Sequence, residues 1–153
     1  MAAPATNKGQ RRRQEIIEGA AAILREQGPQ GVSHRAVAQR VGCSLSATTY
    51  YFHGLDDLLR EAGRVNIARW ASRAEGIAEE AERDPSPGSE QQRMALILRA
   101  TLPSDEEMLG HYLQLVAAGQ SAPVRTSYRT GRDRLNAAVT RVLRQVGVAH
   151  SAE

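Results

Sequence analysis

Two groups of side chains in this sequence have the chemistry to bind a ligand directly. Hydroxyl groups are concentrated in residues 44–50, which read S-L-S-A-T-T-Y, and three consecutive arginines stand at residues 11–13. Hydroxyl groups can reach phosphate oxygens and base edges without steric obstruction, and guanidinium groups pair with phosphates. These residue types indicate nucleic acid as the ligand.

The hydroxyl-rich run needs a scaffold, and the surrounding sequence predicts one. Ser33 can cap a helix that Gly42 ends, because glycine enters the left-handed conformation without steric cost. Ser44 can then cap a second helix over residues 45–52, with Phe52 as its core anchor. Two short helices joined by a tight glycine-containing turn form a helix-turn-helix, whose second helix is sized to enter a major groove.

The same residues resemble a known family. The runs S-H-R-A-V-A-Q-R-V-G (residues 33–42) and G-C-S-L-S-A-T-T-Y-Y-F-H-G-L-D-D-L-L (residues 42–59) are similar to the signature of TetR-type (TetR/AcrR) transcriptional regulators. The resemblance covers roughly residues 10–62. It implies an all-α protein in which a three-helix DNA-binding domain (11–54) precedes a helical regulatory domain (55–153) that senses a small molecule. It also implies a homodimer that reads a palindromic operator in double-stranded DNA.

Together, the residues and the resemblance predict a set of DNA contacts. The set is Ser33, Arg35, Ser44, Leu45, Ser46, Thr48, Thr49, Tyr50 and His53, with Arg11, Arg12 and Arg13 as a basic arm. The arginine cluster is also compatible with a plain solvated helix start. The chain departs from the family pattern at Thr49, where tyrosine is common, and at Leu55, where a phosphate-binding lysine is common; a neutral leucine cannot neutralise a phosphate.

The composition of the chain supports an all-α protein and indicates the cellular compartment in which it works. The chain has 153 residues, of which 41% are hydrophobic, and strand-like alternation is lacking. The net charge of +3 arises within residues 1–60, which hold eight basic against five acidic residues. The single cysteine, Cys43, excludes an internal disulfide and is interpreted as a packing residue rather than a redox-sensitive thiol. Without an N-terminal signal or an apolar run of membrane length, we expect a cytoplasmic protein with no membrane partner.

Helices and breaks can be assigned along the rest of the chain. Residues 1–10 are expected to be a disordered tail, and helices are predicted over 13–27 and 54–83. Capping boxes predict further helices from Ser89 and from Ser104, and Pro123 starts a last helix that Gly147 ends. TetR-type proteins carry about two more C-terminal helices, which form the dimer, and we expect this chain to lack them.

The regulatory domain has candidate residues for a ligand of unknown type. Apolar and aromatic side chains at helical spacing could line a cavity, namely Trp70, Met94, Leu98, Met108, Tyr112 and Tyr128. The alternative interpretation is that they fill the core, or an interface in the case of Trp70.

These observations favour a ligand-responsive DNA-binding repressor. No catalytic constellation, metal-ligand spacing or phosphate loop is present, so neither an enzyme nor a cofactor is expected. The second hypothesis is a TetR-like interaction protein that does not bind DNA and pairs with a full-length relative.

Overall fold

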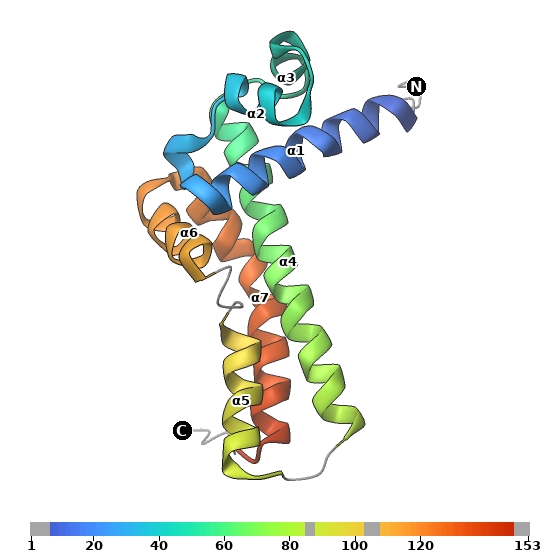
Figure 1. The fold of residues 1–153 in the computed structure, drawn as a ribbon, viewed down its shortest axis with the longest axis vertical. Coiled ribbons are helices and arrows are strands. Elements are labelled where there is room, and N and C mark those ends of the chain that lie inside the picture. Colours follow the sequence, from blue (N-terminus) through green and yellow to red (C-terminus); the bar gives the residue numbers. More distant parts are fainter. Residues whose placement is uncertain (1–6, 85–87, 103–107, 149–153) are drawn as a thin grey trace. The chain divides into compact units, whose positions relative to one another are not determined.

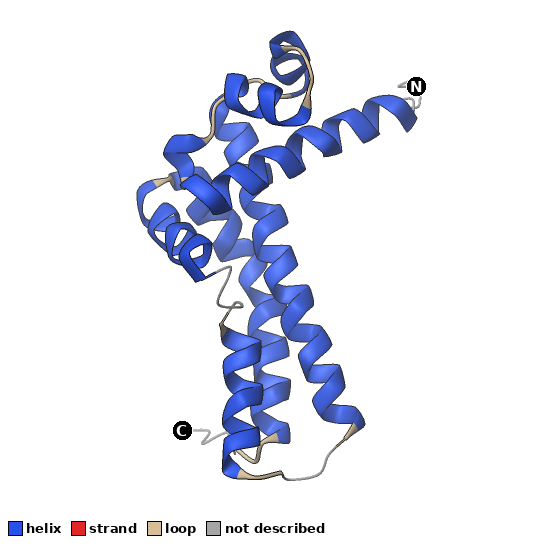
Figure 2. Cartoon of the chain, viewed as in Figure 1, coloured by secondary structure: helices blue, strands red, loops and turns tan. Residues whose placement is uncertain are grey.

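The computed structural model describes residues 7–84, 88–102 and 108–148, and these residues form helices and loops only (Figure 1, Figure 2). The elements are α1 (Asn7–Gln27), a 3₁₀ turn (Pro29–Gly31), α2 (His34–Val41), α3 (Leu45–Tyr51), α4 (Leu55–Arg83), α5 (Glu90–Thr101), α6 (Met108–Gln120) and α7 (Ala122–Gln145). The prediction of an all-α fold is confirmed. Among the helices of the described residues, none combines the length and the apolar character needed to cross a bilayer.

The chain divides into two compact units. The first unit comprises Met1–Asn66 with Leu109–Tyr128, and the second comprises Ile67–Met108 with Arg129–Glu153. The division therefore falls inside α4 and α7, while the predicted domain bounds of 11–54 and 55–153 stay a prediction. Each of these two helices supplies its N-terminal part to the first unit and its C-terminal part to the second.

The first unit is built around the apolar face of α1. Ile16, Leu24 and Phe52 are almost fully buried there, as the periodicity of the sequence predicts. A close approach of α1 and α2 depends on Gly19, because a Cβ at that position would overlap Cγ1 of Val41. This contact fixes how the helix-turn-helix sits on its supporting helix.

The second unit packs α4 and α7 through small side chains. Ala71, Ala74 and Ala78 of α4 are fully buried, as is Ala138 of α7. Two bidentate ion pairs, Glu75 with Arg134 and Glu82 with Arg141, lie seven residues apart on both helices. The equal spacing means that the two helices run parallel through this unit, with α5 beside α7 (Figure 1).

Several element boundaries differ from the predictions, among them the start of α1, the end of α6 and the start of α7. Helix α1 begins at Asn7, so residues 7–10 of the expected tail are helical; lysine, glutamine and arginine favour helix strongly enough to offset Gly9. Helix α6 ends at Gln120 and contains Gly119, while the predicted capping box at Ser104 lies outside the described residues. Helix α7 begins at Ala122, with Pro123 in its first turn, where a missing N–H costs little.

Candidate nucleic-acid interface

The helix-turn-helix forms as its capping residues predict. The Ser33 hydroxyl accepts a hydrogen bond from the Ala36 amide at 3.1 Å, and the Ser44 hydroxyl accepts one from the Ala47 amide at 3.2 Å. Between the two helices Gly42 adopts φ 66° and ψ 41°, the left-handed conformation that glycine tolerates. Both helices are therefore capped, and the turn that joins them has a defined geometry.

Helix α3 presents small polar groups and one exposed aromatic ring. Tyr50 is 79% exposed and Leu45 is 46% exposed. The exposed hydroxyls of Ser44 and Ser46 lie 2.9 Å apart, while Thr49 donates within its own helix to the Leu45 and Ser46 carbonyls. These hydroxyls can exchange a local partner for a phosphate or base at little cost, so this face of α3 can approach a duplex closely.

Thr48 was predicted to contact DNA, but its position in the structure contradicts that prediction. Its side chain has no exposed surface, and its hydroxyl donates to the Leu45 carbonyl at 2.8 Å. A residue at this register of α3 lies four positions before the buried Phe52 and points into the unit rather than away from it. The sequence prediction failed because it used the type of side chain without its helical phase.

The other predicted contacts on α2 and after α3 are accessible. Ser33, Arg35 and His53 are exposed, and Arg35 makes no ion pair with any residue that the structure describes. Arg40, by contrast, binds Glu26 through two hydrogen bonds of 2.7 and 2.6 Å. The hydrogen bond from Arg40 holds the pKa of the Glu26 carboxyl below its ordinary value. Arg40 thus joins α2 to α1 through Glu26. The guanidinium of Arg35 remains available to bind a phosphate.

The three arginines of the predicted arm have different environments. Arg11 and Arg12 pair with Glu15 at 3.2 and 2.8 Å on the surface of α1. Arg13 lies 5.2 Å from the centre of the Phe52 ring and 3.6 Å from the Glu61 carboxylate. We therefore assign Arg13 to the packing of the first unit and retain Arg11 and Arg12 as candidate phosphate contacts.

A groove that the sequence did not indicate lies beside this arm. Lys8, Gly9, Arg11, Arg12 and Tyr51 line it together with Glu15, and its volume is about 390 Å³. The Tyr51 ring also packs edge-on against Tyr50, with 5.1 Å between the ring centres. Tyr51 was missed because the pairing of the start of α1 with the end of α3 is a tertiary contact.

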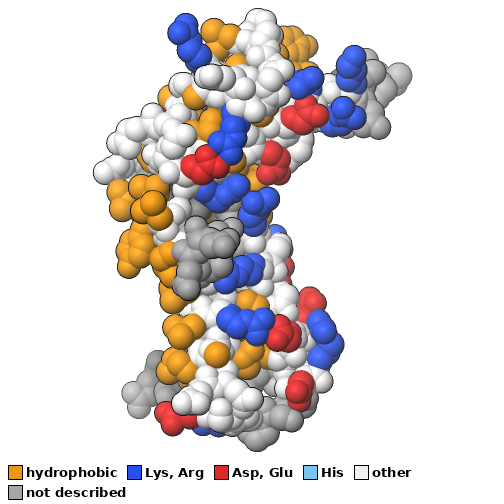
Figure 3. Space-filling view, viewed as in Figure 1, with side chains coloured by type: hydrophobic (Ala, Val, Ile, Leu, Met, Phe, Trp, Pro, Cys, Tyr) orange, Lys and Arg blue, Asp and Glu red, His pale blue; other side chains and the backbone are white. Residues whose placement is uncertain are grey.

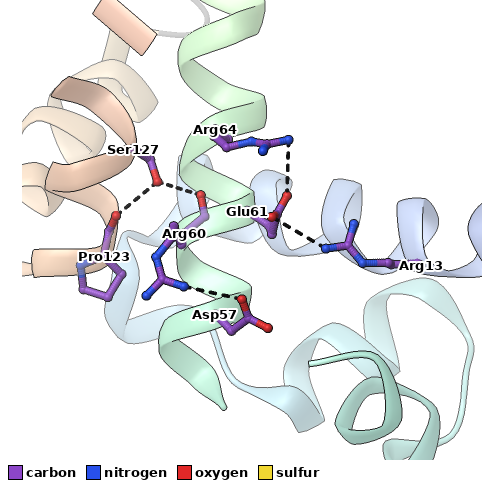
Figure 4. Close-up of polar contacts among 7 residues, drawn as sticks. All are labelled: Arg13, Asp57, Arg60, Glu61, Arg64, Pro123 and Ser127. Carbon is purple, nitrogen blue, oxygen red and sulfur yellow. Dashed lines mark hydrogen bonds and ion pairs between the residues drawn. The ribbon is translucent and has the colours of Figure 1, made fainter. Parts of the chain in front are cut away.

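The N-terminal part of α4 is tied to both α1 and α7 (Figure 4). The buried Ser127 hydroxyl donates to the Arg60 carbonyl at 2.7 Å, with the Pro123 carbonyl at 3.1 Å. On the other side of α4, Glu61 lies between Arg13 and Arg64, each at 3.6 Å. The start of α4 therefore has polar contacts on two sides within the first unit.

A second polar contact inside the first unit centres on Asn66, which the sequence did not single out. Its amide nitrogen donates to the Ala21 carbonyl at 3.2 Å, and its oxygen accepts from Arg25 at 2.6 Å. Tyr128 is buried beside this pair, and burial raises the pKa of its phenol, which stays protonated. Tyr128 is thus part of a satisfied polar cluster.

The six predicted ligand residues are divided between the two units, so their role as the lining of a cavity stays a prediction. Met94 and Leu98 of α5 are 52% and 46% exposed, and Tyr112 of α6 is 63% exposed. Tyr112 and Tyr128 belong to the first unit, whereas Trp70, Met94, Leu98 and Met108 belong to the second. Helical periodicity alone could not tell that Met94, Leu98 and Tyr112 are exposed.

Comparison with known proteins gives the class of this fold. No family model matches the chain. The HTH-type transcriptional regulator PksA of Bacillus subtilis is 31% identical over 100 residues, which are 65% of this chain and 46% of that protein. The chain thus spans about half the length of this curated relative.

Solved structures narrow the class to the TetR type. A TetR-family member from Streptomyces coelicolor is 26% identical, with a TM-score of 0.53, and 88% of this chain and 78% of that one are covered. The multidrug binding protein EbrR is 30% identical, with a TM-score of 0.54, and 87% and 78% of the two chains are covered. In sequence and in fold this chain is TetR-like.

Proposed function

We propose that the chain is a DNA-binding transcriptional repressor of the TetR type that responds to a small molecule. The observation that carries the proposal is the exposed face of α3, with Tyr50, Thr49 and Ser46 on a capped helix-turn-helix. The likeness to transcriptional regulators supports it. A transcriptional regulator works in the compartment that holds its DNA, and the relative PksA is bacterial, so we propose that the protein is cytoplasmic.

The contacts have separate tasks in this proposal. Ser46, Thr49 and Tyr50 read base edges and Leu45 contacts a thymine methyl group, while Arg35 and the groove of Lys8, Arg11, Arg12 and Tyr51 bind phosphates. Phosphate contacts fix the register of α3 and make the affinity dependent on salt.

Reading a palindrome requires a second copy of the chain. In the first unit α6 exposes Leu109, Tyr112, Leu115 and Val116, and Figure 3 shows hydrophobic side chains at the surface over this helix. An apolar surface of this kind is typical of a protein–protein contact. We propose that it contributes to a homodimer whose two α3 helices occupy successive major grooves.

The proposal that the chain responds to a small molecule is supported by the proteins to which it is similar. EbrR is a multidrug binding protein with structures in complex with proflavin and malachite green. In this chain α4 runs without a break from the first unit into the second, so a ligand in the second unit can bias the position of the DNA-binding helices.

The test is selection of sequences from a random double-stranded DNA library by the purified chain. Enrichment of a two-fold symmetric sequence supports the proposal, and its affinity should fall with rising salt. Tyr50→Ala should lose the enriched sequence while keeping helical content. Failure to enrich any sequence over the library would contradict DNA reading by this chain.

The interaction-protein hypothesis is favoured by one observation. Leu55, which is 39% exposed, begins α4 where TetR-type proteins commonly have a phosphate-binding lysine. If the chain acts only by pairing with a relative, it should bind that relative and enrich no sequence in the selection.

A further inference from the structure

We propose that an open cavity at the surface of the second unit, in which Arg132 and Asn136 are exposed, binds a planar aromatic carboxylate. Trp70 of α4, Thr101 of α5 and five residues of α7 line this cavity, whose volume is about 350 Å³. The α7 residues are Arg132, Leu135, Asn136, Val139 and Thr140. The volume is in the range of small-molecule sites, which are apolar with a few convergent polar groups.

The spacing of the α7 residues sorts the lining into two strips. Arg132, Asn136 and Thr140 recur at four-residue intervals and so lie one above the other on one face of the helix. Leu135 and Val139, also four apart, form a parallel apolar strip, and the Trp70 indole adds aromatic surface from α4. A ligand with a flat apolar body and a polar edge fits this pattern.

The charge of the residues that line the cavity indicates which polar group the ligand carries. Arg132 is the one charged side chain among the seven lining residues, and it makes no ion pair with a residue that the structure describes. By contrast Arg99, Arg134 and Arg141 in the same unit each bind a glutamate through two hydrogen bonds. The positions four residues before and after Arg132 are Tyr128 and Asn136, so its own helix supplies no acidic partner at that spacing. A guanidinium in this position pairs best with a carboxylate, which it can bind through two parallel hydrogen bonds.

The ligand would lie with its ring against Trp70, Leu135 and Val139 and its carboxylate at Arg132. Asn136 and Thr140 can donate hydrogen bonds to further oxygen substituents along the edge of the ring. That such a ligand is the effector rests on the proposed function; that it binds in this cavity does not.

The experiment uses 2-naphthoate as the probe, with calorimetry for affinity and tryptophan fluorescence for location. Trp70 is the only tryptophan of the chain, so a change in emission on binding reports on this cavity. We expect saturable binding of 2-naphthoate, with binding of the neutral 2-naphthamide and of the planar cation proflavin weaker by roughly ten-fold or more. Equal or tighter binding of either comparison ligand would overturn the proposal.

Two matched arginine variants on α7 test whether Arg132 binds the carboxylate of the ligand. Arg132→Gln should weaken 2-naphthoate binding by roughly ten-fold or more, whereas Arg129→Gln, an exposed arginine outside the lining, should leave it unchanged. Equal losses in both variants would indicate non-specific attraction to a basic helix and would overturn the site. Helical content measured on each variant shows that the fold is retained.

A third measurement separates this proposal from the proposed function. The duplex enriched by selection is titrated with the chain in the presence and absence of 2-naphthoate. Weaker duplex binding that is lost in Arg132→Gln supports an effector site. Binding of 2-naphthoate without enrichment of any duplex leaves the cavity assignment standing and contradicts the DNA-binding proposal instead.

Discussion

Two adjacent threonines of α3 have opposite environments. Thr48 is fully buried with its hydroxyl bonded to the Leu45 carbonyl, and Thr49 is exposed. We predict that Thr48→Val changes the free energy of unfolding by about 1 kcal/mol or less and leaves duplex affinity unchanged, because its hydroxyl does not reach solvent. Thermal unfolding and a binding titration on the selected duplex measure the two effects.

Tyr50→Ala is expected to give the reverse result. It removes a ring that is 79% exposed, so stability should be preserved while specific affinity falls by about 1–3 kcal/mol. If Thr48→Val, and not Tyr50→Ala, weakens the specific complex, then α3 does not present its Tyr50 face to the duplex.

The ion pair of Glu26 with Arg40 gives a prediction for pH. Hydrogen bonding to Arg40 lowers the folded-state pKa of Glu26, so the pair stabilises the fold above the unfolded-state pKa of the carboxyl, near 4.5. That contribution is lost as pH falls through the lowered folded-state pKa, where the carboxylate becomes protonated. Wild type should therefore have a higher melting temperature than Glu26→Gln at pH 7, and the difference should shrink as the pH falls below 4.5.

The size of this difference is limited by solvent. Both side chains are largely exposed, and surface ion pairs contribute little and are screened by salt. An equal difference at pH 7 and pH 3 would mean that the loss in Glu26→Gln does not arise from the charge of Glu26.

At the scale of elements, the contact of α1 with α2 positions the DNA-binding surface. A Cβ at Gly19 would overlap Val41, so Gly19→Ala should push α2 away and destabilise the fold by about 1–3 kcal/mol. Adding Val41→Ala should restore part of the loss, because it removes the overlapping atom. Chemical denaturation of the two single variants and the double variant measures this coupling.

Gly76 provides the matched control for that cycle. It lies inside α4, is exposed, and a Cβ there would meet nothing within 4 Å. Gly76→Ala should therefore stabilise the chain by roughly 0.5–1 kcal/mol through helix propensity alone. If Gly19→Ala behaves like Gly76→Ala, the close approach of α1 and α2 does not hold in solution.

The local signals of the sequence predicted the elements well. Ser33, Gly42, Ser44 and Ser89 cap their helices as their residue types predict, since capping depends on neighbours within four residues. Contacts between elements could not be predicted in this way. Asn66 and Ser127 bond to backbone groups 45 and 67 positions away, and nothing local to either residue indicates such a partner.

At the scale of the whole molecule, the apolar surface of α6 is the feature that calls for a partner. Leu115→Glu places a charge among Leu109, Tyr112 and Val116. Light scattering over a concentration series should give a dimer for the wild-type chain and a shift toward monomer for Leu115→Glu, because burying an unpaired charge is costly. A dimer that is indifferent to Leu115→Glu would place the interface elsewhere.

The positions of the candidate ligand residues could not be predicted from the sequence at the scale of the whole molecule. Met94 and Leu98 have the periodicity of an inward face, yet α5 exposes them. The cavity that does form beside α7 depends on Trp70 and Thr101, which lie 31 positions apart and come from different helices. The packing of whole helices decides which helix faces contact each other. The periodicity of a single helix does not predict that packing.

Photo-crosslinking from α3 tests the central claim most directly. A benzophenone side chain is placed at position 50 on α3, or at position 94 on α5 as the control, and each chain is irradiated with the selected duplex. The structure predicts crosslinks to bases from position 50 and none to bases from position 94, since Tyr50 is the most exposed large side chain on the proposed reading face. Crosslinks to bases from position 94, or from neither position while the duplex is bound, would contradict DNA reading through α3.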